Sequence, residues 1–241
     1  GTRVDGHTRW AHVASDELFT YLFFSCKRGH AGMTEMDVLP HFHGVAIHDC
    51  WASYWKFNVL HAICCAHLLR ELNGVIENHP EQTWAPRFKK LLLDMKKTKE
   101  DAIAMNLASA DEHTIQYYNE EYDANIQVAF AENPMVTTEA KKKGRPKKGK
   151  VLALIERLQK YKGEVCHLLK DFQIDFDNNQ AERDLRMIKT KTKVSGCFRT
   201  EEGIRDYLTV MSYIGTAKKH GKNAVEAIKN AFMGRPELIF E

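Results

Sequence analysis

The sequence predicts an α/β fold in which a mixed sheet flanked by helices is interrupted by a mostly helical insertion. Strand patterns fill the first third of the chain, helical periodicity fills most of the rest, and a basic loop separates two helical stretches. A hydrophobic content of 44% with 28% charged residues is typical of a globular chain. We expect residues 1–66 to form the first part of the core, 67–174 the helical insertion, and 175–241 the helices that complete the core.

The first third of the chain carries strand signals separated by turns. Residues 2–4 and 8–15 predict a hairpin, because the Asp5-Gly6 pair between them favours a two-residue turn. Residues 18–25 are rich in aromatic residues and predict a third strand. The elements expected next are a short helix over 33–39 that ends before Pro40, a strand over 44–49, and a strand over 59–65 that leads into a helix.

The middle and the end of the chain have helical spacing. Apolar residues recur every three or four positions between about 84 and 132, and this region has no convincing strand pattern. The period resumes from Leu152 to Leu169, and residues 203–219 predict a long final helix.

A polar row on one predicted helix is the most informative feature of the sequence. Asp177 or Asn178 is suited to cap the start of this helix. The row shares one helical face, at steps of three, four and three, and comprises Asn179, Glu182, Arg186 and Lys189. The apolar stripe that would hold the helix against a core comprises Ala181, Leu185 and Ile188. A carboxylate followed by two cations suits metal binding beside phosphates; the alternative is a solvated face whose Glu–Arg pair contributes about 0.3–0.5 kcal/mol.

Asp49 is the second candidate acid. It ends the short apolar run 44–49, and side chains at the ends of central strands commonly carry catalytic groups. The alternative is an aspartate that caps the following turn.

The segment from His61 to His67 contains Cys64 and Cys65 and has spacings that resemble structural zinc ligands. No matching pair of ligands occurs elsewhere in the sequence. We therefore favour a junction between a strand and a helix, with buried cysteines and a hydrogen-bonded histidine.

Two basic segments favour a phosphodiester substrate over a small neutral one. The loop at 141–150 places Arg145 and Lys147 in a Gly-Arg-Pro context that resembles a minor-groove arm. Lys191 and Lys193 extend the basic side of the helix that carries Glu182. The alternative for such a charge run is a solvated loop.

Whole-chain properties narrow the class of protein. A net charge of +3 is too small to identify a nucleic-acid partner by itself. Six cysteines without a regular framework indicate reduced thiols and a cytoplasmic location. No apolar run reaches the roughly 18–20 residues that span a bilayer, and no secretory leader is expected. The chain starts within a predicted strand, so we expect it to be a piece of a longer protein.

The assembled motifs resemble the catalytic domain of the IS66-family transposases over nearly the whole chain. The matching segments are Arg-Val-Asp-Gly at 3–6, Thr-Arg-Trp at 8–10, His-Asp-Cys-Trp-Ala-Ser-Tyr at 48–54, the run 61–72, Asp-Asn-Asn-Gln-Ala-Glu-Arg at 177–183, and the run 193–200.

This resemblance implies an RNase H-like fold with three acidic ligands, the DDE set. It places the second acid at Asp49 and the third at Glu182, and it suggests that Lys189 approaches a phosphate of the substrate. Cys64 and His67 match a short signature that such transposases carry after the last strand. The first acid would fall just before Gly1, and Asp5 in the hairpin turn is a poor substitute for it.

The implied activity is metal-dependent cleavage and strand transfer of DNA at transposon ends. Two Mg²⁺ or Mn²⁺ ions would be held by the acids, with Asp49 between both ions and Glu182 on one of them. A polypeptide of residues 1–241 would be inactive, because it lacks the first acid. A homodimer on paired DNA ends is expected. Two alternatives remain: a DNA-binding scaffold with a structural zinc at Cys64 and His67, and an RNase H-like nuclease that cuts without joining.

Overall fold

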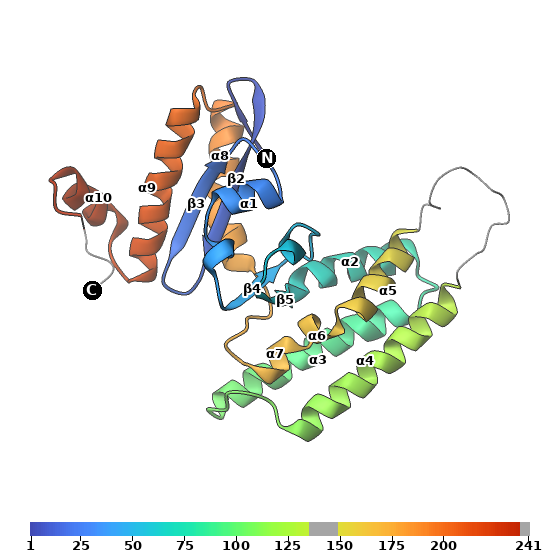
Figure 1. Ribbon diagram of the computed structural model, residues 1–241. Coiled ribbons are helices and arrows are strands. Elements are labelled where there is room, and N and C mark those ends of the chain that lie inside the picture. The colour runs from blue at the N-terminus through green and yellow to red at the C-terminus, as the bar shows by residue number, and fades with distance from the viewer. Residues whose placement is uncertain (135–148, 237–241) are drawn as a thin grey trace. The chain divides into compact units, whose positions relative to one another are not determined.

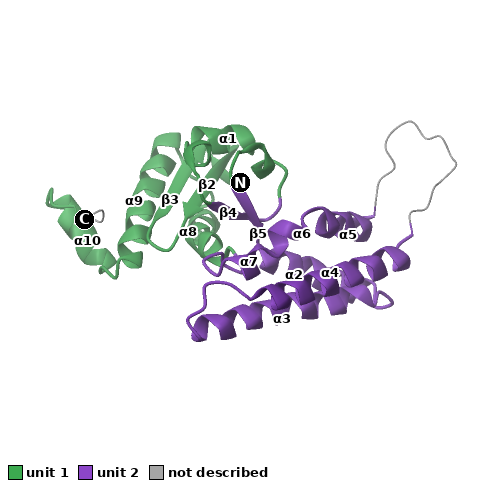
Figure 2. Cartoon of the chain, turned by 60° about the horizontal axis from the view of Figure 1, so that its bottom comes forward, with its two compact units in different colours: residues 1–44, 51–59, 178–241 green, residues 45–50, 60–177 purple. Residues whose placement is uncertain are grey.

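The computed structural model describes residues 1–134 and 149–236, and it confirms a mixed α/β chain (Figure 1). Two compact units can be distinguished within it. Unit 1 contains the described parts of Gly1–Gly44, Trp51–Val59 and Asn178–Glu241, and unit 2 contains those of Val45–Cys50 and Leu60–Asp177 (Figure 2). None of the described helices has the length and apolar run needed to cross a bilayer.

Unit 1 is built on an antiparallel sheet with the order β1-β2-β3. These strands are Thr2–Val4, His7–Ser15 and Thr20–Ser25. The predicted hairpin is confirmed, since Val4 pairs with His7 across a turn in which Asp5 and Gly6 have φ values of 46° and 71°. Positive φ at both central residues is the geometry that an Asp-Gly pair favours.

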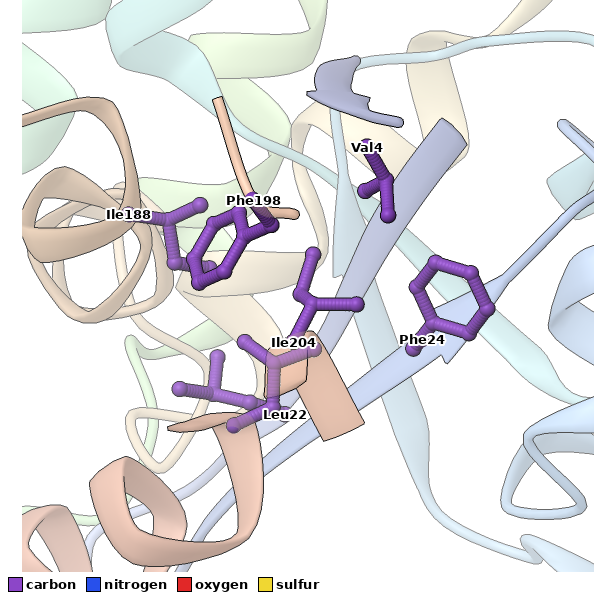
Figure 3. Close-up of a cluster of buried hydrophobic side chains, with 7 residues drawn as sticks. Val4, Leu22, Phe24, Ile188, Phe198 and Ile204 are labelled. Atoms are coloured by element: carbon purple, nitrogen blue, oxygen red, sulfur yellow. The ribbon is translucent and has the colours of Figure 1, made fainter. Parts of the chain in front are cut away.

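Unit 1 also contains helices. They are α1 His30–Glu35, η1 Leu39–His41, η2 Tyr54–Lys56, α8 Asn179–Ser195, α9 Glu201–Lys219 and α10 Ala224–Phe232. Helix α8 packs against β1 and β2, and α9 packs against β3. Figure 3 shows the buried side chains between them: Val4, Leu22, Phe24, Ile188, Phe198 and Ile204. Each such burial contributes about 1.5–3 kcal/mol, so the docking of α8 and α9 depends on this cluster.

Unit 2 combines a parallel strand pair with helices. The pair is β4 Val45–His48 and β5 Leu60–Ile63, in register from Val45 with Leu60 to His48 with Ile63. The helices are α2 Cys65–Asn78, α3 Trp84–Ala104, α4 Glu112–Glu132, α5 Lys150–Lys160, α6 Lys162–Val165 and α7 His167–Lys170.

The predicted helical middle of the chain is confirmed, and its aromatic residues explain how these helices pack. Phe88 contacts Trp84 on α3 and Tyr122 on α4 edge to face, with ring centroids 6.3 and 4.7 Å apart. The Tyr122 hydroxyl donates a hydrogen bond of 2.8 Å to the Leu158 carbonyl of α5. Three helices are therefore joined by one aromatic cluster with a satisfied hydroxyl.

Three sequence expectations are corrected by the structure. The helix expected over 33–39 is α1 followed by the separate turn η1, because Asp37 adopts a φ of 61° that ends a helix. Strand β3 begins at Thr20 and not at Leu18, because the Asp16 carboxylate accepts hydrogen bonds from the Leu18 and Phe19 amides in a turn.

The third correction concerns the sheet. We expected one mixed sheet, whereas the described strands form two. The edge of β1 that faces away from β2 is bonded to Phe198. The Phe198 amide donates to the Arg3 carbonyl, and the Asp5 amide donates to the Phe198 carbonyl.

Candidate functional site

Helix α8 presents the predicted polar row away from the core of unit 1. It begins at Asn179 with Asn178 as its N-cap residue, and Glu182 lies in its first turn, where a negative charge is favoured. The apolar stripe is confirmed, because Ala181 and Ile188 are buried and Leu185 packs against the core. Consequently Glu182 is half-buried, and the two cations that follow on the same row, Arg186 and Lys189, are exposed.

A buried polar cluster that sequence reasoning missed fixes the rotation of α8. The Asp184 carboxylate Oδ2 accepts hydrogen bonds from Ser15 Oγ at 2.8 Å and Thr20 Oγ1 at 3.0 Å, and Lys219 Nζ lies 3.7 Å from it. The side chains of Asp184 and Lys219 are only 11% and 10% exposed. This cluster joins α8 to the ends of β2 and β3 and to the end of α9.

Lys219 is the centre of this buried polar cluster. Its ammonium group donates to Ser15 Oγ at 2.6 Å and to the carbonyls of Asp16 and Phe19 at 2.7 and 2.6 Å. Burial lowers the pKa of Lys219, and the nearby Asp184 and Asp16 charges oppose that shift. Because Asp184 is two residues beyond Glu182, the cluster fixes the orientation of the first turn of α8. In this orientation the helix face that carries Glu182, Arg186 and Lys189 points away from the core.

The basic residues after Glu182 occupy different environments. Lys193 is exposed, whereas the Lys191 ammonium packs over the rings of Phe198 and Tyr207, 5.4 and 5.8 Å from their centroids. Lys189 and Arg28 both lie near the nitrogen of Gly1. The two predicted DNA-binding residues of the basic loop, Arg145 and Lys147, lie outside the described residues.

Asp49 directly follows β4, at the strand end where the sequence placed it, and it is exposed. The next residue, Cys50, has a φ of 66°, so the chain turns sharply there. Asp5 lies in the β1–β2 turn, where the sequence placed it.

Two histidines support the strand end beside Asp49. The Cys50 amide donates to His48 Nδ1 at 3.0 Å, so this nitrogen carries no proton. His48 therefore donates through Nε2 to His61 Nδ1 on β5, at 3.0 Å. Burial, followed by the neighbouring His61, lowers the pKa of His48 from 6.5 to about 3. The hydrogen bond between the two rings ties β4 to β5.

This neutral His48 predicts an acid-sensitive contribution to stability. Its pKa is lower in the folded state, so the unfolded chain binds more protons between pH 6.5 and about 3. The contribution is present above pH 6.5 and is lost as the pH falls toward 3, by up to about 1.4 kcal/mol per pH unit. Denaturant unfolding at several pH values should show a steeper acid loss for the wild type than for His48→Gln. The exposed-histidine variant His79→Gln should follow the wild type, and equal slopes for His48→Gln and the wild type would contradict the assignment.

Cys64 and His67 lie at the junction of β5 and α2 that we favoured. Cys64 is the N-cap residue of α2 and is buried; its amide donates to the His48 carbonyl at 2.9 Å, and its own carbonyl accepts from the His67 amide. In the described ranges 1–134 and 149–236, no three His, Cys, Asp or Glu side chains are grouped so as to hold a metal ion. The six cysteines lie in the described ranges and form no disulfide with one another.

The structure therefore groups the predicted residues in two sets. Glu182, Arg186 and Lys189 share one face of α8 in unit 1, and Asp49 belongs with the histidine pair in unit 2. That Asp49 and Glu182 approach each other is a proposal, which is developed from their chemistry below.

Comparison with known proteins identifies the family. The family described as "Transposase IS66 family" matches residues 1–206, which include β1 to β5, α8 and both candidate acids. No curated protein and no solved structure gives a match. The chain therefore belongs to the IS66 family of transposases.

Proposed function

We propose that this chain is the catalytic domain of a DDE transposase, which cleaves DNA strands at transposon ends and joins them to target DNA. The observation that carries the proposal is one face of α8. On it the first-turn carboxylate of Glu182 is followed by two exposed cations, Arg186 and Lys189, in a chain that belongs to a transposase family. An antiparallel β1-β2-β3 meander followed by the parallel pair β4–β5 supports an RNase H-like architecture. We propose that residues 1–66 form the first part of this core, residues 67–174 a helical insertion, and residues 175–241 the helices that complete the core.

Asp49 and Glu182 are the proposed metal ligands. Both supply hard carboxylate oxygens, which Mg²⁺ and Mn²⁺ prefer, and neither is fully buried, so the donor set fits such ions. Bound divalent ions would activate the attacking oxygen and stabilise the leaving oxygen of a phosphodiester. The backbone turn at Cys50 and the hydrogen-bonded pair of His48 and His61 hold the start of the Asp49 segment, and the Asp184 cluster holds the turn that carries Glu182.

The cations of α8 are the proposed contacts to the DNA backbone. Arg186 can offer paired N–H donors to one phosphate, and Lys189 lies one turn further along the same face. Lys191 and Lys193 would add sequence-independent attraction, as would Arg145 and Lys147. We further propose that two copies of the protein act in the cytoplasm on paired DNA ends.

A third carboxylate would complete a DDE set, and the strand register supports a position for it ahead of β1. The β1–β2 pairing matches Thr2 with Arg9, so a residue joined ahead of Gly1 would extend β1 along β2 toward Ser15. Ser15 bonds to Asp184, two residues from Glu182. We therefore propose that the first acid of the set lies on an extension of β1 ahead of Gly1.

Metal-directed cleavage of the protein tests the shared site. Fe²⁺ bound in place of Mg²⁺, with ascorbate and peroxide, should cut the backbone near both Asp49 and Glu182, and excess Mg²⁺ should suppress both cuts. Asp49→Asn should remove the cut near Glu182 as well as its own, because one ion needs both carboxylates. Cuts near one acid only, or cuts near Cys64 and His67, would overturn the assignment.

A further inference from the structure

Arg28 is held between two tryptophan rings in unit 1. Its guanidinium carbon lies 4.6 Å from the centroid of the Trp51 ring and 5.0 Å from that of Trp10. Trp10 belongs to β2 and Trp51 to the segment that leads to η2, so segments far apart in the sequence build this cation site. Contacts with two aromatic rings restrict the motion of the Arg28 side chain, although this side chain is exposed.

The local backbone keeps Arg28 in place. Gly29 follows it with a φ of 74°, and a Cβ atom at Gly29 would lie 2.9 Å from Ser53 Oγ and 3.2 Å from the Trp51 ring. Only glycine allows this close approach. Tyr54 packs edge to face on Trp51, with centroids 6.4 Å apart. The turn, the two indoles and the tyrosine thus form a preorganised holder for the guanidinium group.

The edge of the guanidinium group remains available for a ligand. Among the described residues, Arg28 makes ring contacts but no hydrogen bond or ion pair, and its side chain is exposed. Arg28 and Lys189 both lie near the Gly1 nitrogen, close enough for their positive charges to act on it. Arg28 and Lys189 therefore lie close to the same end of β1, where an anion would relieve their mutual repulsion.

We propose that Arg28, held between Trp10 and Trp51, binds a phosphate of the DNA strand that Lys189 also contacts. The inference rests on the proposed function, because it deepens the recognition of the same DNA substrate. The guanidinium carbon lies near two indole rings, and the N–H groups around it are the part that recognises a ligand, since their paired donors match two phosphate oxygens.

Salt-dependent DNA binding by the full-length protein tests this site. The probe is a fluorescein-labelled duplex of mixed sequence with a single-stranded tail, followed by anisotropy at several salt concentrations. Arg28→Ala should weaken binding about tenfold, the effect of one charge-assisted hydrogen-bonded contact. It should also reduce the slope of log K against log salt by about 0.9, the value for one phosphate. The DNA affinity of Arg28→Lys should lie between those of the wild type and Arg28→Ala, because lysine keeps the positive charge but lacks the paired N–H donors of arginine.

Two further variants separate positioning from charge. Trp51→Leu should weaken binding several-fold, because it releases Arg28 without changing the net charge. Arg87→Ala removes an exposed arginine of α3 in unit 2 and should bind within twofold of the wild type. Circular dichroism checks the fold of each variant, and Arg28→Gln replaces Arg28→Ala if the latter unfolds.

The outcomes are distinct. Equal affinities and slopes for the wild type and the Arg28 variants would overturn the proposal, as would an equal loss in Arg87→Ala. A second measurement uses inorganic phosphate as a competitor. If millimolar phosphate displaces DNA at constant ionic strength, Arg28 belongs to a site for a small anion, and the proposed DNA contact is overturned. If Glu182→Gln still cleaves DNA, the proposed function fails while the Arg28 result stands on its own.

Discussion

Glu182→Gln and Asp49→Asn are each expected to lower DNA cleavage and strand transfer by about a thousandfold, the upper end of the cost of removing one transition-state stabiliser. Each change keeps the size of the side chain and removes the negative charge that a divalent ion requires. Activity is measured with the full-length protein, Mg²⁺ and DNA that carries a transposon end. Because both acids are proposed to serve one site, the double variant should be no less active than the worse single variant.

Matched acids provide the controls for these two variants. Glu202→Gln removes an exposed first-turn acid of α9 in unit 1, and Asp101→Asn removes an exposed acid of α3 in unit 2. Both should keep at least about half of the wild-type activity, since surface changes usually alter little. Retention of strand transfer by Glu182→Gln or Asp49→Asn would remove that residue from the catalytic set.

Asp184→Ala is expected to destabilise unit 1 by about 3–5 kcal/mol, which is the range for removing one partner of a buried ion pair. The change leaves the Lys219 ammonium without its buried counter-charge and removes the acceptor of Ser15 and Thr20. Denaturant unfolding measures the loss. Asp94→Ala, which breaks the exposed Lys90–Asp94 pair, should cost less than about 1 kcal/mol.

A double variant tests whether the loss comes from the uncompensated charge. Asp184→Ala with Lys219→Met should recover part of the stability, because no buried ammonium remains. If Asp184→Ala unfolds no more easily than Asp94→Ala, the cluster does not anchor α8.

Local patterns predicted the elements that depend on neighbouring residues. The Asp5-Gly6 turn and its flanking alternation gave the first hairpin, and spacing on α8 separated the buried Ile188 from the exposed Lys189. Both rest on short-range geometry, the two-residue turn and the 3.6-residue period, which one sequence is enough to show.

Features that need distant partners were not predicted. The partners of Asp184 are 164 and 169 residues away in Thr20 and Ser15, so in the sequence Asp184 looked like an ordinary polar residue of α8. His61 was grouped with Cys64 and His67 by spacing, whereas the fold pairs its ring with His48 across two parallel strands. Arg28 gave no signal beyond a turn, because both indoles that hold it come from other segments.

A crystal structure of the full-length protein with transposon-end DNA and Mn²⁺ tests the central claim most directly. The account predicts anomalous density for Mn²⁺ at a site that carboxylate oxygens of both Asp49 and Glu182 coordinate, next to a DNA phosphate. Mn²⁺ bound away from these carboxylates, or Asp49 and Glu182 on opposite faces of the protein, would contradict it.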